Sequence, residues 1–230
     1  MSYTVSPIGT LHSCFKEKFA IPRQPQLAPA ARGWLELHPP FDRPEAVMGL
    51  EQVSHVWLLF LFHRALEDKP RLKVRPPRLG GNQYIGVFAS RATHRPNGLG
   101  QSVVRLERVE PGRLYLSGID LLDGTPILDV KPYVPYADAV GAAHNLLADA
   151  APSSIEVTWD DSARQQADMH SKRLNEPLSD LIEQCLAQDP RPAYQQPSPE
   201  RRYGTYLWDV EVHWHYPEPS VIRILDVAPA

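Results

Sequence analysis

Short apolar segments separated by turn residues occupy most of the first two thirds of the chain. The continuous apolar run at residues 56–62 (VWLLFLF) predicts a strand that is buried on both faces. Further strands are expected at residues 84–89, 102–109, 113–119 and 125–130, with glycine, proline, asparagine and aspartate between them. Because little helix lies between these segments, the pattern favours an antiparallel sheet or barrel over a doubly wound sheet.

A short helix is expected before the first of these strands. Asp42 can cap its N-terminus, Pro44 suits its first turn and Gly49 can end it. The alanine-rich region at residues 137–151 shows no clear period. It therefore predicts a loop or a weak helix.

The pattern changes after Pro152, where strand-like and helix-like segments alternate. Residues 155–159 (IEVTW) alternate between apolar and polar positions. Residues 161–188 carry an apolar helical face, which Pro177 divides into two helices. Residues 206–215 (YLWDVEVHWH) alternate most clearly and predict one long strand.

A last strand is expected at residues 221–225. The change of pattern indicates a second, smaller α+β domain over residues 153–230. We find no internal repeat and no low-complexity segment that would indicate another kind of architecture.

Composition and charge exclude several classes of protein. The 230 residues are 43% hydrophobic and 22% charged, which fits a packed core and argues against global disorder. The net charge of -3 argues against a protein that coats nucleic acid non-specifically, but it allows a local basic face. The two cysteines, Cys14 and Cys185, form neither a disulfide framework nor a zinc motif, so a reducing cytoplasm is expected. The longest apolar run is too short to span a bilayer, and no signal peptide is expected before Lys16.

A local basic face is indicated between Arg71 and Arg105, where the chain has no Asp or Glu. The basic residues of this stretch are Arg71, Lys73, Arg75, Arg78, Arg91, Arg95 and Arg105. Arginine forks match phosphate oxygens and stack on bases, and Tyr133 and Tyr136 add aromatic faces beside Lys131. This combination suits single-stranded or loop RNA. A solvated basic surface with structural arginine–aspartate pairs explains the same residues, so both interpretations stay open.

Other polar residues have both a chemical and a structural interpretation. Asp120 has apolar neighbours, where a carboxylate can bind ribose hydroxyls or an ammonium group, or pair with an arginine. His63 ends the first predicted strand and either contacts a ligand or hydrogen-bonds locally. His213 and His215 share a strand face without a third ligand, so no metal is expected. The sequence has no P-loop and no convincing Rossmann glycine fingerprint.

Six longer blocks of the sequence are distinctive: EKFAIPRQP (17–25), GLEQVSHVWLLFLFH (49–63), VRPPRLGGN (74–82), GVFASRATHRPNGLGQS (86–102), GIDLLDGTPILDVKPYVPYAD (118–138) and DPRPAYQ (189–195). In this order they resemble the TsaA/TrmO family. Members of that family are S-adenosylmethionine-dependent tRNA methyltransferases that act on the exocyclic nitrogen of threonylcarbamoyladenosine, next to the anticodon. The resemblance implies a mainly β chain with a single-sheeted antiparallel β-barrel domain, here at residues 1–152, that binds the cofactor. It also implies a homodimer with the cofactor near the subunit interface and, as in longer members, an added C-terminal domain.

The resemblance implies roles for individual residues as well. Contacts to S-adenosylmethionine are expected from Pro22, Arg23, Gln24, His63, Arg64, Arg91, Gln101, Asp120, Leu121, Leu122 and Asp123. Contacts to the tRNA, through its phosphates or the threonyl carboxylate, are expected from Arg95, Asn97, Lys131 and Tyr133. Tyr136 and Asp138 are the candidates to position or deprotonate the acceptor nitrogen, which is a poor nucleophile while it keeps its proton.

Two other functions stay open at this level. A methyltransferase for another acceptor would bind the cofactor but leave threonylcarbamoyladenosine unmethylated. A cofactor-sensing or RNA-binding module would bind without any turnover. Neither spacing nor charge identifies the tRNA species or the role of the C-terminal domain.

Overall fold

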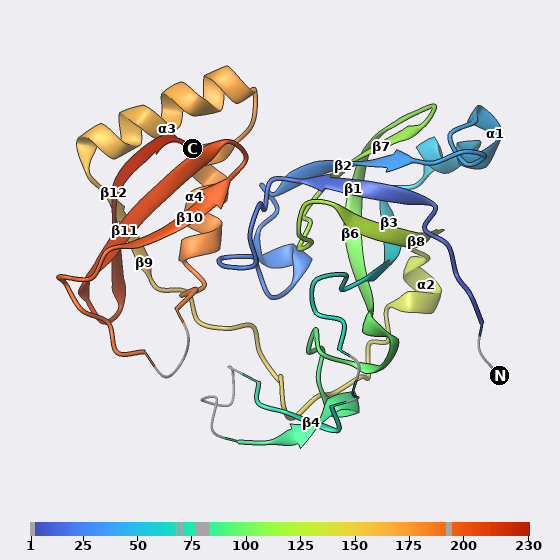
Figure 1. The fold of residues 1–230 in the computed structure, drawn as a ribbon, viewed down its shortest axis with the longest axis horizontal. Helices are drawn as coiled ribbons and strands as arrows, with labels where there is room; N and C mark the ends of the chain where they lie inside the picture. The colour runs from blue at the N-terminus through green and yellow to red at the C-terminus, as the bar shows by residue number, and fades with distance from the viewer. Residues whose placement is uncertain (1–2, 68, 70, 77–82, 192–194) are drawn as a thin grey trace.

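The computed structural model describes residues 3–67, 69, 71–76, 83–191 and 195–230. Figure 1 shows two lobes side by side, a barrel formed by the N-terminal part of the chain and a sheet with two helices formed by the C-terminal part. The predicted turn at residues 80–82, as well as Arg78, lies outside the described residues.

The N-terminal lobe is a closed antiparallel barrel with the strand order β1-β2-β7-β6-β3-β8. Its strands are β1 Gly9–Ser13, β2 Arg32–Leu37, β3 His55–Leu61, β6 Leu99–Glu110, β7 Arg113–Ser117 and β8 Thr125–Pro132. The β6–β7 hairpin turns at Gly112 and the entry to β8 turns at Gly124, both with positive φ, as the turn residues predict. The expectation of a mainly β barrel chain is confirmed, although the sequence did not reveal β1 and β2.

Strand β3 differs from its prediction, because only one of its faces is buried. Its inward side chains, which join the core, belong to Val56, Leu58 and Phe60. Its outward side chains, which are only half-buried, belong to Trp57, Leu59 and Leu61. The expected burial of both faces is wrong because a closed barrel has a single interior, and nothing within the described chain covers the outside of β3 completely.

Two other predictions for the barrel lobe are corrected. The strand expected at residues 84–89 is only β5, Ile85–Gly86, which pairs with β4, Lys73–Val74, and leads into a 3₁₀ helix at Val87–Ala89. The short helix α1 is present at Pro44–Val47, but its N-cap residue is Arg43 and no side chain caps it. Asp42 therefore does not have the predicted capping role.

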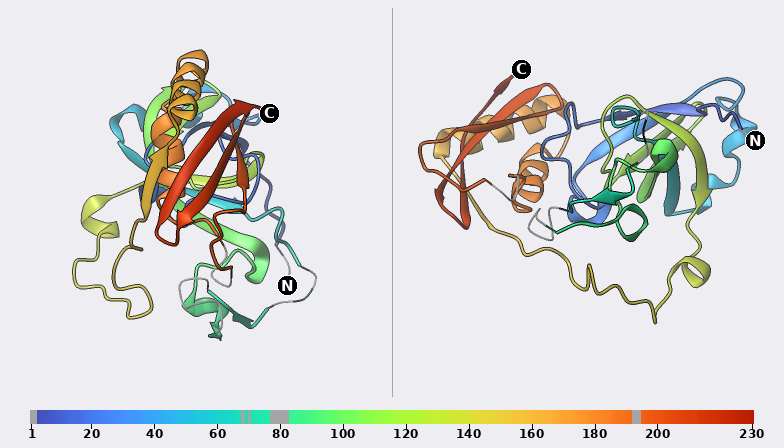
Figure 2. Two further views of the ribbon diagram at one scale, coloured as in Figure 1. Left: turned by 90° about the vertical axis from the view of Figure 1, so that its left-hand side faces the viewer. Right: turned by 60° about the horizontal axis from the view of Figure 1, so that its bottom comes forward.

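The remaining short helices of this lobe lie in its loops. They are the 3₁₀ helices Pro25–Leu27, Leu50–Gln52 and Pro96–Gly98, and the helix α2, Pro135–Asp138. After α2, residues 139–155 form neither helix nor strand, which agrees with the expected loop. Figure 2 shows this connection running along the outside of the molecule from α2 to the C-terminal lobe.

The C-terminal lobe is a four-stranded sheet with the order β10-β11-β12-β9 and two helices packed together on one side (Figures 1 and 2). Its elements are β9 Glu156–Trp159, α3 Asp161–Leu174, α4 Leu178–Leu186, β10 Tyr203–Leu207, β11 Val210–Glu218 and β12 Val221–Pro229. Pro177 precedes α4 directly, so the predicted division of the helical region is confirmed.

The single strand predicted at residues 206–215 is wrong. The segment is a hairpin, in which β10 ends at Leu207 and β11 begins at Val210. Trp208 lies in the turn with φ 54°, a conformation that is unusual for a bulky residue. Alternation of apolar residues continues through this turn, which is why the sequence pattern alone did not show it.

The two lobes share one hydrophobic core. Phe15 of the barrel lobe forms an isolated antiparallel bridge with Leu207. The backbone N–H of Ala30 donates to Gln184 Oε1 over 2.8 Å. These buried contacts fix the C-terminal lobe against the barrel.

Candidate functional site

Four polar side chains from distant parts of the barrel lobe meet in one cluster. Gln24 precedes the 3₁₀ helix Pro25–Leu27, and Arg91 follows the 3₁₀ helix Val87–Ala89. Ser102 lies on β6 and Asp120 follows β7. We call Gln24, Arg91, Ser102 and Asp120 the polar cluster.

Hydrogen bonds connect the members of the polar cluster in two pairs. Arg91 Nη1 donates to Gln24 Oε1 over 2.5 Å, and Ser102 Oγ donates to Asp120 Oδ1 over 2.7 Å. Arg91 also interacts electrostatically with Asp120, which links the two pairs. Ser102 was not among the predicted residues, and only its position beside Gln101 within a quoted block could have pointed to it.

Asp120 has the most unusual carboxyl group of the site. Burial raises the pKa of Asp120 to about 6, although the Ser102 hydrogen bond and the Arg91 charge both act in the opposite direction. A half-buried carboxylate of this kind gains from a further hydrogen-bond donor or a cation. The cluster can therefore accept a ligand that brings a hydroxyl or an ammonium group to Asp120 and an anionic or polar group to Arg91.

The residues that follow Asp120 have different environments. Leu121 and Leu122 are buried, so their side chains can provide an apolar wall. Both oxygens of the Asp123 carboxylate already have partners within the chain. Oδ1 accepts the backbone N–H of Ser13 over 2.8 Å, and Oδ2 lies 2.9 Å from Lys16 Nζ. Asp123 is thus tied to the barrel wall rather than open to a ligand.

Three other predicted cofactor residues are close to members of the polar cluster in the chain. Pro22 is buried and Arg23 is exposed, just before Gln24. Gln101 is exposed on β6, next to Ser102 and opposite Leu59 of β3.

His63 and Arg64 follow β3 directly. The pKa of His63 is lowered, first by burial and then by the neighbouring Arg64. Lys18 Nζ donates to the backbone carbonyl of Arg64 over 2.5 Å. Within the described part of the chain, we find no hydrogen bond or ion pair between these two residues and the polar cluster.

On another part of the barrel, Asp138 of α2 is held by two donors. The indole N–H of Trp57 and the backbone N–H of Val134 donate to Asp138 Oδ2 over 2.9 and 2.8 Å. The Val134 bond, followed by the Trp57 bond, lowers the pKa of Asp138. Asp138 is therefore a weak base at neutral pH. Trp57 could not be recognised as its partner from the sequence, because the two residues are far apart in the chain.

The aromatic residues around α2 present their rings in two ways. Tyr136 is 93% exposed, so its ring is available to a partner. Tyr133 lies against Trp57, with ring centroids 6.1 Å apart and planes tilted by 46°. Trp57 therefore supports both Tyr133 and Asp138 from the outer face of β3.

The predicted substrate residues fall into two groups. Lys131 Nζ lies 2.7 Å from Asp129 Oδ2 on β8. Arg95 and Asn97 line a polar cavity of about 240 Å³, and Arg95 Nη1 donates to the carbonyl of Ser90 over 3.0 Å. The other residues that line this cavity are Ala65, Glu67, Lys69, Arg71, His94 and Pro96.

The basic stretch is only partly neutralised by acidic residues in the described chain. Arg71 pairs with Glu67 and Arg105 with Glu107. Arg75 lies over the ring of Tyr84, and both Arg91 and Arg95 bond to neutral oxygens. Structural arginine–aspartate pairs therefore do not account for the whole stretch, which favours an anionic ligand.

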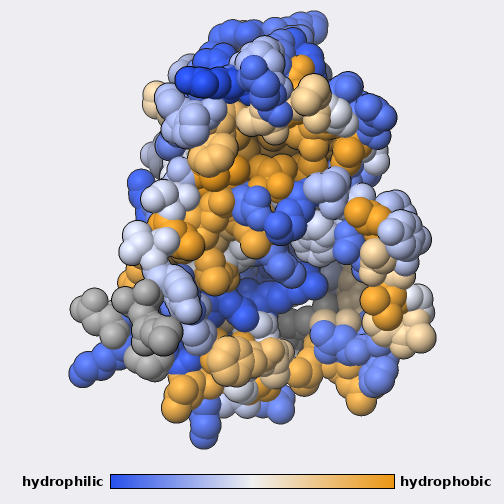
Figure 3. Space-filling model, turned by 90° about the vertical axis from the view of Figure 1, so that its right-hand side faces the viewer, coloured by the Kyte–Doolittle hydropathy of each residue, from blue (hydrophilic) through white to orange (hydrophobic). Residues whose placement is uncertain are grey.

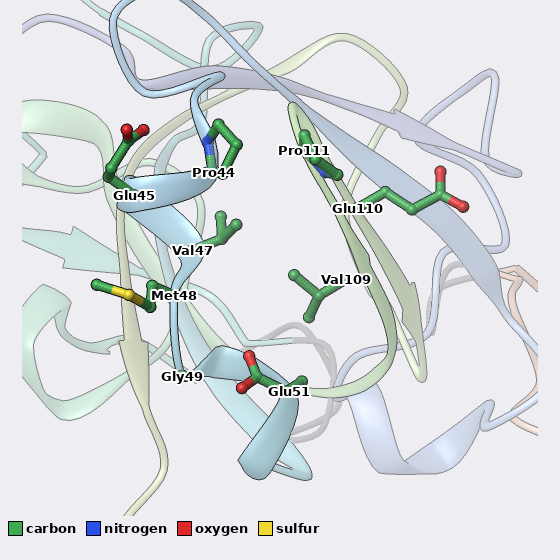
Figure 4. Close-up of a pocket in the computed structure, with 9 residues that line it drawn as sticks. All are labelled: Pro44, Glu45, Val47, Met48, Gly49, Glu51, Val109, Glu110 and Pro111. Atoms are coloured by element: carbon green, nitrogen blue, oxygen red, sulfur yellow. The ribbon is translucent and has the colours of Figure 1, made fainter.

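A larger cleft, of about 440 Å³, lies elsewhere, between α1 and the β6–β7 hairpin (Figure 4). It is lined by Pro44, Glu45, Val47, Met48, Gly49, Glu51, Val109, Glu110 and Pro111. None of the predicted site residues belongs to it. Its glutamates also make it a poor place for an anionic RNA.

Within the described residues, no group of three or more His, Cys, Asp or Glu side chains could hold a metal ion. His213 lies 3.0 Å from both Glu211 and Asp226, while His215 Nδ1 lies 2.8 Å from the carbonyl of Pro199. No helix in the described part of the chain is long and apolar enough to cross a membrane.

Comparison with known proteins covers both lobes. Residues 10–139 match the family model described as tRNA-methyltransferase O N-terminal domain, and residues 152–230 match the TrmO C-terminal domain. A protein of Pseudomonas aeruginosa (strain PAO1) named putative S-adenosylmethionine-dependent methyltransferase RcsF is 74% identical over 228 residues, which is 99% of each chain. The tRNA (adenine(37)-N6)-methyltransferase of Escherichia coli (strain K12) is 43% identical over 219 residues, 93% of each chain.

A solved structure agrees with these matches. The crystal structure of TrmO from Pseudomonas aeruginosa is 64% identical and superposes with a TM-score of 0.88, covering 99% of each chain. The similarity therefore extends over the barrel and the C-terminal lobe together.

Proposed function

The chain belongs to the tRNA-methyltransferase O family, and on this premise we propose that its polar cluster binds S-adenosylmethionine. The protein is an S-adenosylmethionine-dependent tRNA methyltransferase. Its acceptor is the exocyclic nitrogen of threonylcarbamoyladenosine next to the anticodon. One observation carries the assignment of the cluster: Arg91, Gln24 and Asp120 were predicted from three separate blocks, and in the folded barrel Arg91 bonds to Gln24 while its charge acts on Asp120.

The chemistry of the cluster fits S-adenosylmethionine. Asp120 can accept from ribose hydroxyls or an ammonium group, and Arg91 can bind a carboxylate. Leu121 and Leu122 are buried beside Asp120 and supply the apolar wall that a purine or a thioether chain needs. When bound, S-adenosylmethionine supplies a methyl group on a sulfonium, which leaves by in-line displacement. We retain Pro22, Arg23, His63, Arg64 and Gln101 as surrounding contacts, and we assign Asp123 to positioning.

On the acceptor side, the chain must align the nucleoside and stabilise it when its N–H proton leaves. We assign Arg95, Asn97 and Lys131 to the tRNA phosphates or the threonyl carboxylate, because they add positive charge or donors at the surface. Tyr133 and Tyr136 offer aromatic faces for stacking. Asp138, whose pKa is lowered, fits a positioning role better than that of a base.

We also propose that the protein is a homodimer. The support is the outer face of β3, where Trp57, Leu59 and Leu61 are half-buried, and the 43% exposed Leu99 of the neighbouring β6. Figure 3, which views the barrel end of the molecule, shows apolar residues gathered on the surface of that end. An apolar area of this kind is typical of a protein interface, and a second copy is the occupant that the family resemblance implies.

Two further assignments are proposals as well. We place the boundary between the two domains at residues 152 and 153, within the irregular connection that follows α2. We assign the protein to the cytoplasm, where its tRNA substrate is available and where two buried free cysteines would stay reduced.

A turnover assay tests the function. Purified protein and S-adenosylmethionine are incubated with bulk tRNA from cells that lack this enzyme, and the digested nucleosides are analysed by mass spectrometry. We expect threonylcarbamoyladenosine to gain one methyl group with the wild type and not with Asp120→Asn.

Two other outcomes would contradict this function. Cofactor binding without that gain would mean another acceptor or a sensing module. Absence of cofactor binding would contradict the methyltransferase function of the chain.

A further inference from the structure

One short piece of chain connects the C-terminal lobe to residues 120–123, which we assign to the cofactor site. Residues 13–16 begin with the last residue of β1 and lie between the β10–β11 hairpin on one side and Asp123 on the other. We call residues 13–16 the bridging segment. Its Ser13, Cys14 and Phe15 are at most 1% exposed, so the segment is part of the common core of the two lobes.

One edge of the bridging segment is bonded to the C-terminal hairpin. Phe15 forms an antiparallel bridge with Leu207, and the backbone N–H of Trp208 donates to the carbonyl of Cys14 over 2.8 Å. The ring of Trp208 stacks on Trp34 of β2, with ring centroids 6.5 Å apart. The hairpin therefore holds this edge through both backbone and side-chain contacts.

The other edge of the bridging segment holds Asp123 at three points. The Ser13 N–H donates to Asp123 Oδ1 over 2.8 Å, and the Asp123 N–H donates to the carbonyl of Phe15 over 2.9 Å. Lys16 Nζ lies 2.9 Å from Asp123 Oδ2. Asp123, which ends the segment 120–123, is thus held by the same short piece of chain that the C-terminal hairpin contacts at Cys14, Phe15 and Lys16.

Lys16 and Trp208 join the two edges directly. Lys16 Nζ lies 5.9 Å from the centre of the Trp208 ring, within the range of a cation–π contact, while it pairs with Asp123. Trp208 keeps a positive φ in the turn, a strained backbone for this residue type. Such strain persists where surrounding contacts hold the residue in place. For Trp208 these include its contacts with Cys14, Lys16 and Trp34 of the barrel lobe.

We propose that Trp208 is a positioning residue, through which the C-terminal lobe holds the segment 120–123 in the conformation that binds S-adenosylmethionine. The proposal rests on the proposed place of the cofactor at the polar cluster. It gives the C-terminal lobe a role in cofactor affinity, separate from any contact with tRNA. The coupling passes from Trp208 through Lys16 and the backbone of residues 13–16 to Asp123.

The test uses the full chain with the substitution Trp208→Gly. Glycine adopts positive φ without strain and keeps the N–H that bonds to Cys14, but it removes the ring that lies over Lys16 and Trp34. We expect the Kd for S-adenosylmethionine, measured by calorimetry, to rise about threefold to tenfold. The KM for S-adenosylmethionine should rise with it, whereas the KM for tRNA should not change.

Arg202→Ala is the matched control. It removes the Arg202–Asp226 ion pair of the C-terminal lobe, which does not touch the bridging segment, and it should leave the Kd unchanged. A milder variant, Lys16→Met, should raise the Kd in the same direction. The double variant, Lys16→Met with Trp208→Gly, should then raise the Kd by less than the product of the two single fold-changes. An unchanged Kd in folded Trp208→Gly, or fully independent effects, would overturn the proposal.

Hydrogen exchange separates this proposal from the proposed function. In the absence of cofactor, Trp208→Gly should speed exchange at the amides of Ser13 and Asp123, while Arg202→Ala should not. If the wild type fails to bind S-adenosylmethionine, the proposed function is wrong, and the exchange rates still decide whether Trp208 controls Asp123. Unchanged exchange at both amides would contradict the coupling itself.

Discussion

Asp120 and Asp138 are both predicted site residues, yet the folded barrel gives them opposite environments. Asp120 is half-buried, and burial raises its pKa to about 6. Asp138 is exposed on α2, and hydrogen bonds from Val134 and Trp57 lower its pKa. The first carboxylate is therefore costly to ionise without a partner, whereas the second is already satisfied by the chain.

The difference between these aspartates indicates a division of labour. A buried carboxylate with capacity for another partner suits the recognition of a ligand. An exposed carboxylate bonded twice within its own neighbourhood suits the fixing of local structure, here α2 with the exposed Tyr136. The cofactor side and the acceptor side of the site thus use the same residue type in different ways.

Of the substitutions that test this difference between Asp120 and Asp138, Asp120→Asn should have the largest effect. Loss of the carboxylate should raise the Kd for S-adenosylmethionine about a hundredfold, because a charge-assisted hydrogen bond is lost at a half-buried position. The same change should stabilise the free protein by about 1–2 kcal/mol at pH 7, because the penalty of ionising Asp120 disappears. Calorimetry measures the first effect and thermal unfolding the second. Asp160→Asn, on the surface of the C-terminal lobe, is the control and should change neither.

The pH dependence of Asp120 follows from the sign of its shift. Its folded pKa of about 6 lies above the ordinary value of 3.8 for an aspartate, so its contribution to stability falls as the pH rises between these values. Cofactor binding should show the opposite trend, because the ligand needs the ionised form. The Kd for S-adenosylmethionine should therefore rise as the pH falls below about 6, and this rise should be absent in Asp120→Asn. A pH-independent Kd would show that Asp120 does not bind the cofactor in its ionised form.

Arg91→Ala should have the next largest effect. Removal of the guanidinium that bonds to Gln24, and whose charge acts on Asp120, should raise the Kd for S-adenosylmethionine about tenfold, since one charge-assisted bond to the ligand is lost. Arg105→Ala is the matched control, because Arg105 belongs to the same basic stretch but pairs with Glu107 on β6. Equal effects of the two substitutions would mean that general charge, and not the cluster, binds the cofactor.

Trp57→Phe should have the smallest effect and should act on the acceptor side only. The substitution keeps an aromatic ring beside Tyr133 but removes the N–H that bonds to Asp138. We expect kcat to fall about threefold to fivefold with an unchanged Kd for S-adenosylmethionine, because α2 is positioned less well. Single-turnover rates and calorimetry separate the two quantities. Trp159→Phe, which removes a similar indole bond to Glu183, should leave kcat unchanged.

Much of the barrel could be predicted from the sequence, but not its closure. The strands that contain Val56–Phe60, Ser102–Val109 and Thr125–Val130 are visible as apolar segments between turns. Strands β1 and β2 were missed, although they complete the barrel by pairing with β8 and β7. Local patterns describe which side chains can be buried, whereas closure depends on backbone pairing between strands far apart in the chain.

The candidate site shows the same limit. Arg91 and Asp120 could be singled out from their residue types and from the family resemblance, but their contacts could not. Ser102, Trp57 and Lys16 gave no separate signal, because serine, tryptophan and lysine are common at positions with no role in a site. Each acquires its role only from a partner in another element: Asp120, Asp138 and Asp123, respectively.

The amino-acid sequence alone is enough to assign the family, the mainly β character of the first lobe, the α+β character of the second and the basic stretch that interrupts an acidic protein. These are properties of residue type and local periodicity, which survive without coordinates. The folded structure is needed to show that Asp120 is half-buried, that Asp138 is already bonded, and that Trp208 turns a hairpin against the barrel. Burial, pKa and coupling depend on distances between atoms, and only folding brings residues 13–16, 120–123 and 208 together.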